Sequence, residues 1–308
     1  MLDVSSLYTQ FSSRSGVVRA VDKVDLSLRN GERLGLIGET GCGKTVLGMS
    51  VVRLLPSTAK TTGSVRYKGK DITCCSEETM REIRGKEISF ILQNPTTSLN
   101  PVMRVGNQIA ESIARHQGVS PNEAYQKAIS LMKQVNFPDA ESRARKYAHE
   151  LSGGMKQKVM IAMGLAGNPS LVIADEPTKA LDRGNKKEIL DLLTSATVDK
   201  SLIMITHDLP AAGEICDRIA VMYGGEIVEE GPAQSILNDP NHPYAHAFMQ
   251  AHPTKGCCPI PGTSPSLISP PTGCRFHPRC PDATEECRDV HPSLMVTEAG
   301  RKIRCHCH

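Results

Sequence analysis

The stretch Gly-Glu-Thr-Gly-Cys-Gly-Lys-Thr, residues 38–45, constrains the fold of this chain more than any other segment. It follows the apolar run 34–37, typical of a buried strand, and leads into residues 45–55, which indicate a helix that Pro56 ends. It fits G-x-x-x-x-G-K-[ST], in which glycine lets the backbone take positive φ and wrap its N–H groups around phosphates. The stretch therefore predicts a strand, a phosphate-binding loop and a helix, in that order.

The residue types of this loop suit nucleotide chemistry. Lys44 can reach the β and γ phosphates, the Thr45 hydroxyl can bind Mg²⁺, and the following helix adds its N-terminal dipole. A thiol at a helix start has a lowered pKa, so Cys42 is a candidate reactive cysteine, although a tolerated small residue is the simpler interpretation. We expect the nucleotide to contact the whole loop: Gly38, Glu39, Thr40, Gly41, Cys42, Gly43, Lys44, Thr45 and Val46.

The rest of the chain has the alternation of an α/β fold. Apolar runs occur at 171–174, 202–205 and 219–222, separated by segments long enough for helices. Continuous apolar strands alternating with helices are typical of a parallel sheet covered on both faces. Residues 1–36 indicate several β segments instead, with apolar alternation and a turn at Asn30-Gly31.

Changes of pattern along the 308 residues indicate the domain organisation. Residues 93 to about 150 have apolar spacings of three and four, which predicts a helical insertion. From Pro232 the chain is rich in Pro, Cys and His, with few apolar runs. We expect a main domain over residues 1–232 and a smaller C-terminal extension over residues 233–308. The reason is that the hydrophobic core of a single domain rarely grows to include a chain of this length.

The apolar run 171–174 ends in Asp175 and Glu176. A carboxylate at the carboxyl end of such a strand lies where α/β proteins bind ligands, and Asp175 can hold the Mg²⁺ that bridges phosphates. Glu176 can polarise an attacking water. Together with Lys44, the acidic pair indicates hydrolysis of a nucleoside triphosphate.

Composition excludes several classes. The chain is 39% hydrophobic and 22% charged, and no apolar run approaches the ~20 residues of a membrane helix. Asp3 stands where a signal peptide would carry basic residues, so we expect a cytoplasmic protein. The net charge of +3 indicates no nucleic-acid partner.

Leu151-Ser152-Gly153-Gly154 precedes the acidic strand. With the loop and LVIADEP, this tetrapeptide resembles the signature of the ATP-binding cassette (ABC) family, and the chain is similar to the nucleotide-binding subunit of an ABC transporter. The resemblance implies an α/β P-loop NTPase with an antiparallel β subdomain, a helical insertion and, here, a small Cys-rich extension. It also implies two subunits that sandwich ATP, so that Ser152, Gly153 and Gly154 touch the triphosphate held by the partner.

Three further positions match family motifs. Gln93 resembles the Q-loop glutamine, Asp182 resembles the D-loop aspartate, and His207 resembles the switch histidine that holds the γ-phosphate. The resemblance implies catalysis by Glu176, His207 and Gln93, nucleotide contacts from Gln93, Asp175 and Asp182, and Mg²⁺ bound by Thr45, Gln93 and Asp175.

One family feature differs in this sequence. The family usually stacks adenine on an aromatic of the early β region, and residues 15–19, Ser-Gly-Val-Val-Arg, contain none. Tyr8 and Phe11 are the nearest aromatics. We expect adenine contacts from the two valines or the arginine, and weak base selectivity.

Segments 93–101, 241–244, 259–262 and 273–281 resemble the oligopeptide, dipeptide and nickel importers in particular. The resemblance implies an ATPase that powers import of peptides, or of a related solute such as chelated nickel, at the cytoplasmic face of the membrane. Its partners would be a second, related ATPase subunit, two membrane permeases and, indirectly, a solute-binding protein. A soluble nucleotide-driven clamp and a regulator that does not hydrolyse ATP are the alternatives.

Seven of the 11 cysteines follow residue 250. Without a secretory signal this favours metal binding over disulfides. Cys274, Cys280, Cys287 and Cys305 supply four thiolates on a Pro-rich segment, which suits either Zn²⁺ or a cubane cluster. The importers that this chain resembles carry a [4Fe–4S] cluster there, and the resemblance favours iron. Two alternatives stay open. His306, Cys307 or His308 replaces Cys305 as the fourth ligand, or the cysteines bind no metal at all.

Overall fold

The computed structural model describes residues 1–253, 255–298 and 300–307. The chain forms two compact units, one of Met1–Cys74 with the residues from Ile205 onward, the other of Cys75–Met204. The first strands therefore fold with the C-terminal third of the chain. The domain boundary near residue 232 stays a prediction, because both of its sides belong to the first unit.

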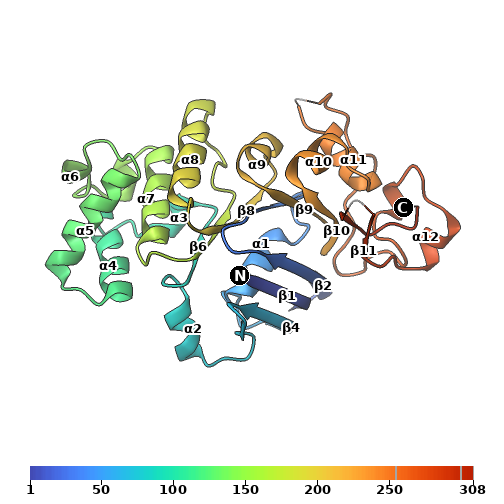
Figure 1. Ribbon diagram of the computed structural model, residues 1–308, viewed down its shortest axis with the longest axis horizontal. Coiled ribbons are helices and arrows are strands. Elements are labelled where there is room, and N and C mark those ends of the chain that lie inside the picture. Colours follow the sequence, from blue (N-terminus) through green and yellow to red (C-terminus); the bar gives the residue numbers. More distant parts are fainter. Residues whose placement is uncertain (254, 299, 308) are drawn as a thin grey trace. The chain divides into compact units, whose positions relative to one another are not determined.

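The first unit contains an antiparallel sheet at the start of the chain (Figure 1). Its β1 and β2 form a hairpin in which Ser13 pairs with Gly16 and Phe11 with Val18. In β2, Val24, Leu26 and Leu28 are buried and the residues between them are exposed, as the apolar alternation predicted. The strands stand in the order β2 (Gly16–Leu28), β1 (Leu2–Ser13), β4 (Ala59–Tyr67) and β5 (Lys70–Asp71).

The same unit contains strands from both ends of the chain. β3 pairs in parallel with β9, and β9 pairs antiparallel with β10. Two short strands of the C-terminal extension then continue from β10, where Glu230 pairs with Lys302. The order is β11 (Met295–Val296), β12 (Lys302–Ile303), β10 (Glu226–Pro232), β9 (Arg218–Tyr223) and β3 (Arg33–Ile37).

Short helices connect these strands. Their bounds are α1 Lys44–Val51, α9 Leu209–Ile215, α10 Ala233–Asn238, α11 Pro243–Gln250, the 3-10 helix η2 His277–Arg279 and α12 Glu285–Asp289. The sequence predicted a helix over 45–55, but α1 ends at Val51. The reason is that Arg53 takes a φ of 53° and its N–H bonds to the Ser50 carbonyl, which stops the helix in a left-handed turn.

In the second unit, strands β6 (Ile88–Ile91), β7 (Leu171–Asp175) and β8 (Ser201–Thr206) follow one another in that order. β6 and β7 are parallel, and β7 is buried along its whole length. The predicted helical insertion corresponds to α3 (Pro95–Ser98), α4 (Val105–Gln117), α5 (Pro121–Gln134), α6 (Ala140–Arg143) and η1 (Ala148–Glu150). The remaining helices are α2 (Glu77–Ile83), α7 (Gly153–Leu165) and α8 (Arg183–Ala196).

The helical insertion has a core of its own. Ile109 and Ile113 of α4 are buried, as are Ala124, Ala128 and Met132 of α5. These positions recur every four residues, which gives each helix one buried stripe, and the two helices pack against each other. Figure 1 shows α4 and α5 side by side. Among the described residues, none of the helices combines the length and apolar character needed to span a bilayer.

Candidate nucleotide site

The predicted phosphate-binding loop, residues 38–45, connects β3 to α1 in the first unit. Gly38, Gly41 and Gly43 have φ values of 149°, 84° and 107°, which disfavour residues with a Cβ. Space forbids a Cβ as well, since it would lie 2.1 Å from the Met222 carbonyl oxygen at Gly38 and 2.1 Å from the Ala20 carbonyl oxygen at Gly43. The glycines thus allow the loop to lie directly against neighbouring backbone.

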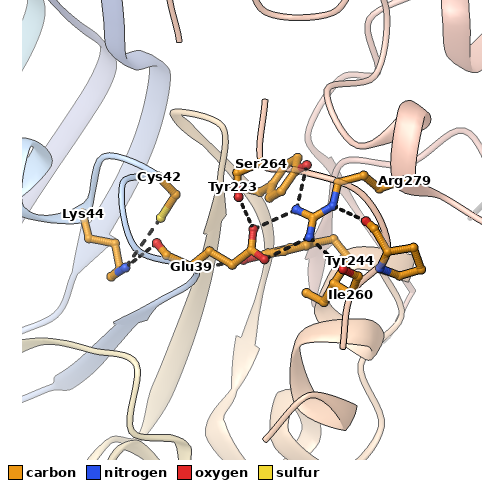
Figure 2. Close-up of polar contacts among 9 residues, drawn as sticks. Glu39, Cys42, Lys44, Tyr223, Tyr244, Ile260, Ser264 and Arg279 are labelled. Carbon is orange, nitrogen blue, oxygen red and sulfur yellow. Dashed lines mark hydrogen bonds and ion pairs between the residues drawn. The ribbon is translucent and has the colours of Figure 1, made fainter. Parts of the chain in front are cut away.

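Lys44 is 7% exposed and its ammonium folds over the loop. The Nζ atom donates to the Gly38 carbonyl at 2.8 Å. It also donates to the Glu39 carbonyl at 2.9 Å (Figure 2). A cation held at the mouth of a backbone loop is suited to phosphate oxygens. Thr45 is the second residue of α1, at the helix N-terminus.

Cys42 is not the reactive thiol that its position suggested. The residue is 6% exposed, and burial raises the pKa of its thiol although Lys44 acts in the opposite direction. The expectation of a lowered pKa at a helix start is therefore wrong here, because desolvation of the thiolate outweighs the nearby ammonium.

Groups far away in the sequence contact this loop, and the sequence analysis assigned them no role. The Glu39 N–H donates to the Tyr244 hydroxyl at 2.9 Å, and the Glu39 carboxylate accepts from both terminal nitrogens of Arg279 (Figure 2). These partners lie 205 and 240 residues along the chain. No local pattern signals such pairs.

Phe11, one of the two aromatics nearest to residues 15–19 in the sequence, is brought opposite that segment by the fold. The β1–β2 hairpin places it directly opposite Val18, and directly opposite residues share one face of a sheet. Its side chain is partly exposed. The hairpin turn between residues 13 and 16 was the available signal, because it folds Phe11 back onto Val18, one of the residues expected to contact adenine.

The second unit gathers another set of predicted residues at the carboxyl ends of β6 and β7. Ile91 pairs in parallel with Ala174. Gln93, two residues after β6 ends, and Asp175, the last residue of β7, therefore lie at the same edge of the sheet. Asp175 is 1% exposed. Glu176 is also buried and has a φ of 48°, a left-handed conformation that costs a residue with a Cβ free energy and is common at functional sites.

The predicted signature starts α7, and the predicted D-loop starts α8. Ser152 caps α7 by accepting from the Met155 N–H, and Asp182 caps α8 by accepting from the Gly184 and Asn185 N–H groups. A Cβ on Gly154 would lie 2.6 Å from Asn185 Oδ1. The structure therefore brings the two predicted motifs together within this unit.

His207 directly follows β8, as the sequence predicted, and its side chain is exposed. Asp208 then caps α9 by accepting from the Ala211 N–H. His207 therefore lies exposed in the one-residue gap between the end of β8 and the N-cap of α9.

The four thiols of the predicted cluster are neighbours in the first unit. The pKa of Cys280 and of Cys305 is raised to about 11, mainly by burial, and the charge of Cys274 contributes in the same direction. The Cys274 N–H donates to the Cys287 carbonyl at 2.8 Å. Within the described part of the chain, however, no three His, Cys, Asp or Glu side chains converge closely enough to hold a metal ion. His308 lies outside the described residues.

Comparison with known families identifies the chain. The ABC transporter family matches residues 21–179, more than half of the 308 residues. The fold and the loop define a P-loop NTPase of the ATP-binding cassette class, and the chain belongs to the ABC transporter family. A second family, the oligopeptide/dipeptide transporter C-terminal region, matches residues 228–287.

Two curated relatives align over nearly the whole chain. The probable peptide ABC transporter ATP-binding protein y4tR of Sinorhizobium fredii is 44% identical, over 99% of this chain and 94% of its own length. The dipeptide transport ATP-binding protein DppD of Escherichia coli is 40% identical, over 99% of this chain and 96% of its own length.

A solved structure shares the fold. The ATP-binding cassette MJ0796, in a dimeric post-hydrolysis state bound to ADP and Pi, superimposes with a TM-score of 0.68 at 26% identity. The match covers 76% of this chain and 99% of that one. The predicted ABC cassette fold is confirmed.

Proposed function

We propose that this chain is the ATP-hydrolysing subunit of an importer for dipeptides or oligopeptides. The observation that carries the proposal is the pairing, in one chain, of an ABC cassette with a C-terminal region matched by the oligopeptide/dipeptide transporter family. The relatives with peptide or dipeptide transport in their names support the same cargo. A related solute such as chelated nickel is the alternative cargo.

The residues of the loop and of the strand ends have distinct roles in the proposed reaction. Lys44 binds the β and γ phosphates, and the N–H groups at the start of α1 add their dipole. Thr45, Asp175 and Gln93 would hold Mg²⁺, which neutralises charge that develops on the transferred phosphoryl group. No step needs a covalent intermediate on the protein.

Water attack is the step that needs a base. Glu176 accepts the proton of the attacking water, His207 holds the γ-phosphate and orients that water, and Gln93 contacts it. The buried position of Glu176 supports this role, because a carboxylate shielded from bulk solvent keeps a fixed geometry. The proton then leaves with the products, ADP and inorganic phosphate, so Glu176 is an ionised carboxylate again at the end of the cycle.

A second cassette completes the reaction centre in this proposal. Ser152, Gly153 and Gly154 begin α7 with a cap and two residues without side chains, an arrangement suited to a phosphate from another subunit. Asp182 caps the neighbouring helix and fixes that surface. MJ0796, which has the same fold, is itself described as a dimer. We infer a related, different chain as the second cassette.

The helical insertion carries a surface suited to a membrane subunit. A groove of ≈ 490 Å³ lies between α4 and α5, lined among others by Met103, Ala110 and Tyr125. Val102, just before α4, is 83% exposed. Apolar side chains around a groove are typical of a docking surface for a helix. We assign this groove to the permeases, which places the chain at the cytoplasmic face of the membrane.

Adenine recognition is proposed for Phe11. The aromatic is partly exposed and faces the same side as Val18. A ring of this kind stacks on a base. Phe11 thus replaces the two valines and the arginine as the proposed base contact.

The cysteine cluster is proposed to hold a [4Fe–4S] group, with Zn²⁺ as the alternative. Four neighbouring thiols are a suitable donor set for such a group. Iron and acid-labile sulfide analysis of anaerobically purified full-length chain tests this, with Cys287→Ser as the ligand variant and the exposed Cys257→Ser as the control. Zinc without iron in both the wild type and the control would overturn the iron assignment.

Copurification from membranes tests the main proposal. Full-length chain should bring down two permeases and a second ATPase subunit, and Val102→Asp should lose the permeases while it still binds ATP. Val198→Asp is the matched control, since Val198 is 65% exposed and lies after α8 of the same unit. Recovery of the chain with nucleic acid, or without any membrane protein, would overturn the proposal.

A further inference from the structure

We propose that the C-terminal extension, residues 233–308, is a working part of the nucleotide site, in which Arg279 is a positioning residue that holds the phosphate-binding loop through Glu39. The proposal goes beyond peptide import, because it concerns ATP binding by the cassette itself. It assigns a role to the extension that is independent of any group on its cysteines.

The contact between Arg279 and Glu39 is a two-pronged ion pair. Nη1 donates to Glu39 Oε2 at 2.9 Å and Nη2 donates to Oε1 at 3.1 Å (Figure 2). Such paired geometry is available to the planar guanidinium and not to an ammonium. The Arg279 side chain is only 4% exposed, so solvent screens this pair little. The Glu39 carboxylate is therefore fixed in direction as well as in charge.

Arg279 is itself held in place by the extension and by Tyr223 of β9. Its Nε donates to the Pro261 carbonyl at 2.7 Å, and its Nη1 donates to the Tyr223 hydroxyl at 3.3 Å. The guanidinium also lies over the Tyr223 ring, 5.8 Å from the centroid. All three guanidinium nitrogens are thus in use, and the arginine connects the extension to the loop as a rigid link.

Two more groups of the extension hold the same loop residue. Tyr244 is fully buried and its hydroxyl accepts from the Glu39 N–H at 2.9 Å. Ser264 donates to Glu39 Oε2 at 2.9 Å. Tyr244 packs against Tyr223 and Phe276, with ring centroids 4.3 Å and 5.4 Å away, so its hydroxyl has a fixed position. The extension therefore binds both the backbone N–H and the side-chain carboxylate of Glu39.

Charge explains why this link matters for a nucleotide. Glu39 adds a carboxylate to a loop whose ligand carries several negative charges, and like charges in one site oppose binding. Burial alone would raise the Glu39 pKa, but the hydrogen bonds and charge of Arg279, with the Ser264 hydrogen bond, lower it and keep the carboxylate ionised. Arg279 therefore supplies the positive charge that offsets a carboxylate next to the phosphates.

The test is ATP binding by purified full-length chain, measured by calorimetry with Mg²⁺ for wild type, Arg279→Gln, Glu39→Gln and the double variant. Arg279→Gln should weaken ATP binding by about tenfold, about 1.4 kcal/mol, and weaken AMP binding less. The double variant should bind ATP more tightly than Arg279→Gln alone, because it lacks the uncompensated carboxylate. Arg279→Lys should fall between Arg279→Gln and the wild type.

Arg288→Gln is the matched control, because it removes the same charge from an exposed position of the same extension. Thermal unfolding of every variant separates loss of fold from loss of binding, and Arg279→Lys serves if Arg279→Gln does not fold. Wild-type ATP affinity in a folded Arg279→Gln chain would overturn the proposal. So would a double variant that binds no better than Arg279→Gln. Neither result depends on which solute the importer carries.

Discussion

The packing of Gly154 leads to a prediction that separates two adjacent signature glycines. A Cβ on Gly154 would lie 2.6 Å from Asn185 Oδ1 and 3.0 Å from its Cγ. Asn185 cannot move freely, because its Nδ2 donates to Asp182 and its N–H donates to Asp182 Oδ1 at 3.1 Å. A Cβ on Gly153 meets only Leu181, at an ordinary 3.8 Å.

The magnitude follows from these distances. Forcing a methyl group into a filled site costs about 1–3 kcal/mol, whereas both variants gain similar helix propensity from alanine. Gly154→Ala should therefore be less stable than Gly153→Ala by about 1–3 kcal/mol. For a protein of this size that difference lowers the melting temperature by about 1.5 to 5 °C.

Differential scanning fluorimetry of the two variants, with wild type beside them, measures the difference. Adding Asn185→Ala to Gly154→Ala should recover part of the loss, because it removes the obstructing amide. Equal melting temperatures for Gly153→Ala and Gly154→Ala would refute the packing argument. A double variant whose loss is the sum of the two single losses would refute the role of Asn185.

Three further predictions concern the first unit. The Glu39 pKa is lowered in the folded chain from an ordinary value of 4.5, so the ionised carboxylate stabilises the fold above that pH and this contribution is lost as the pH falls below it. The free energy of unfolding, plotted against pH in the acid range, should therefore fall more steeply for wild type than for Glu39→Gln. Identical slopes would contradict this. Cys42 should react with iodoacetamide far more slowly at pH 8 than the exposed Cys257, as mass spectrometry of the labelled peptides will show, because burial raises its pKa. Phe11→Ala should weaken ATP binding about tenfold and leave tripolyphosphate binding unchanged, and equal losses for both ligands would exclude stacking on the base.

Local patterns were sufficient for the cassette itself. The loop, the strand that ends in Asp175 and the amphipathic spacing of α4 and α5 are short-range features, and each predicts its own element. The comparisons confirm the family that these motifs resemble. The end of α1 was placed four residues too late because a single left-handed residue, Arg53, stops the helix before Pro56 does.

Contacts between distant segments were beyond the sequence. Arg279 and Glu39 are 240 residues apart, and neither belongs to a pattern that names the other. Base contact was assigned to Val17, Val18 or Arg19 and not to Phe11 because distance along the chain was used, whereas the hairpin sets distance in space. The pKa of Cys42 was predicted in the wrong direction, since burial cannot be read from a position at a helix start.

The central claim is that this chain hydrolyses ATP with Glu176 as the base that activates water. The most direct measurement is steady-state ATP turnover by the purified importer complex that contains Glu176→Gln, with bound ATP measured in the same sample. The claim predicts that ATP stays bound while turnover falls at least a hundredfold, within the range that general bases contribute. Turnover at the wild-type rate by a complex with this substitution would contradict it.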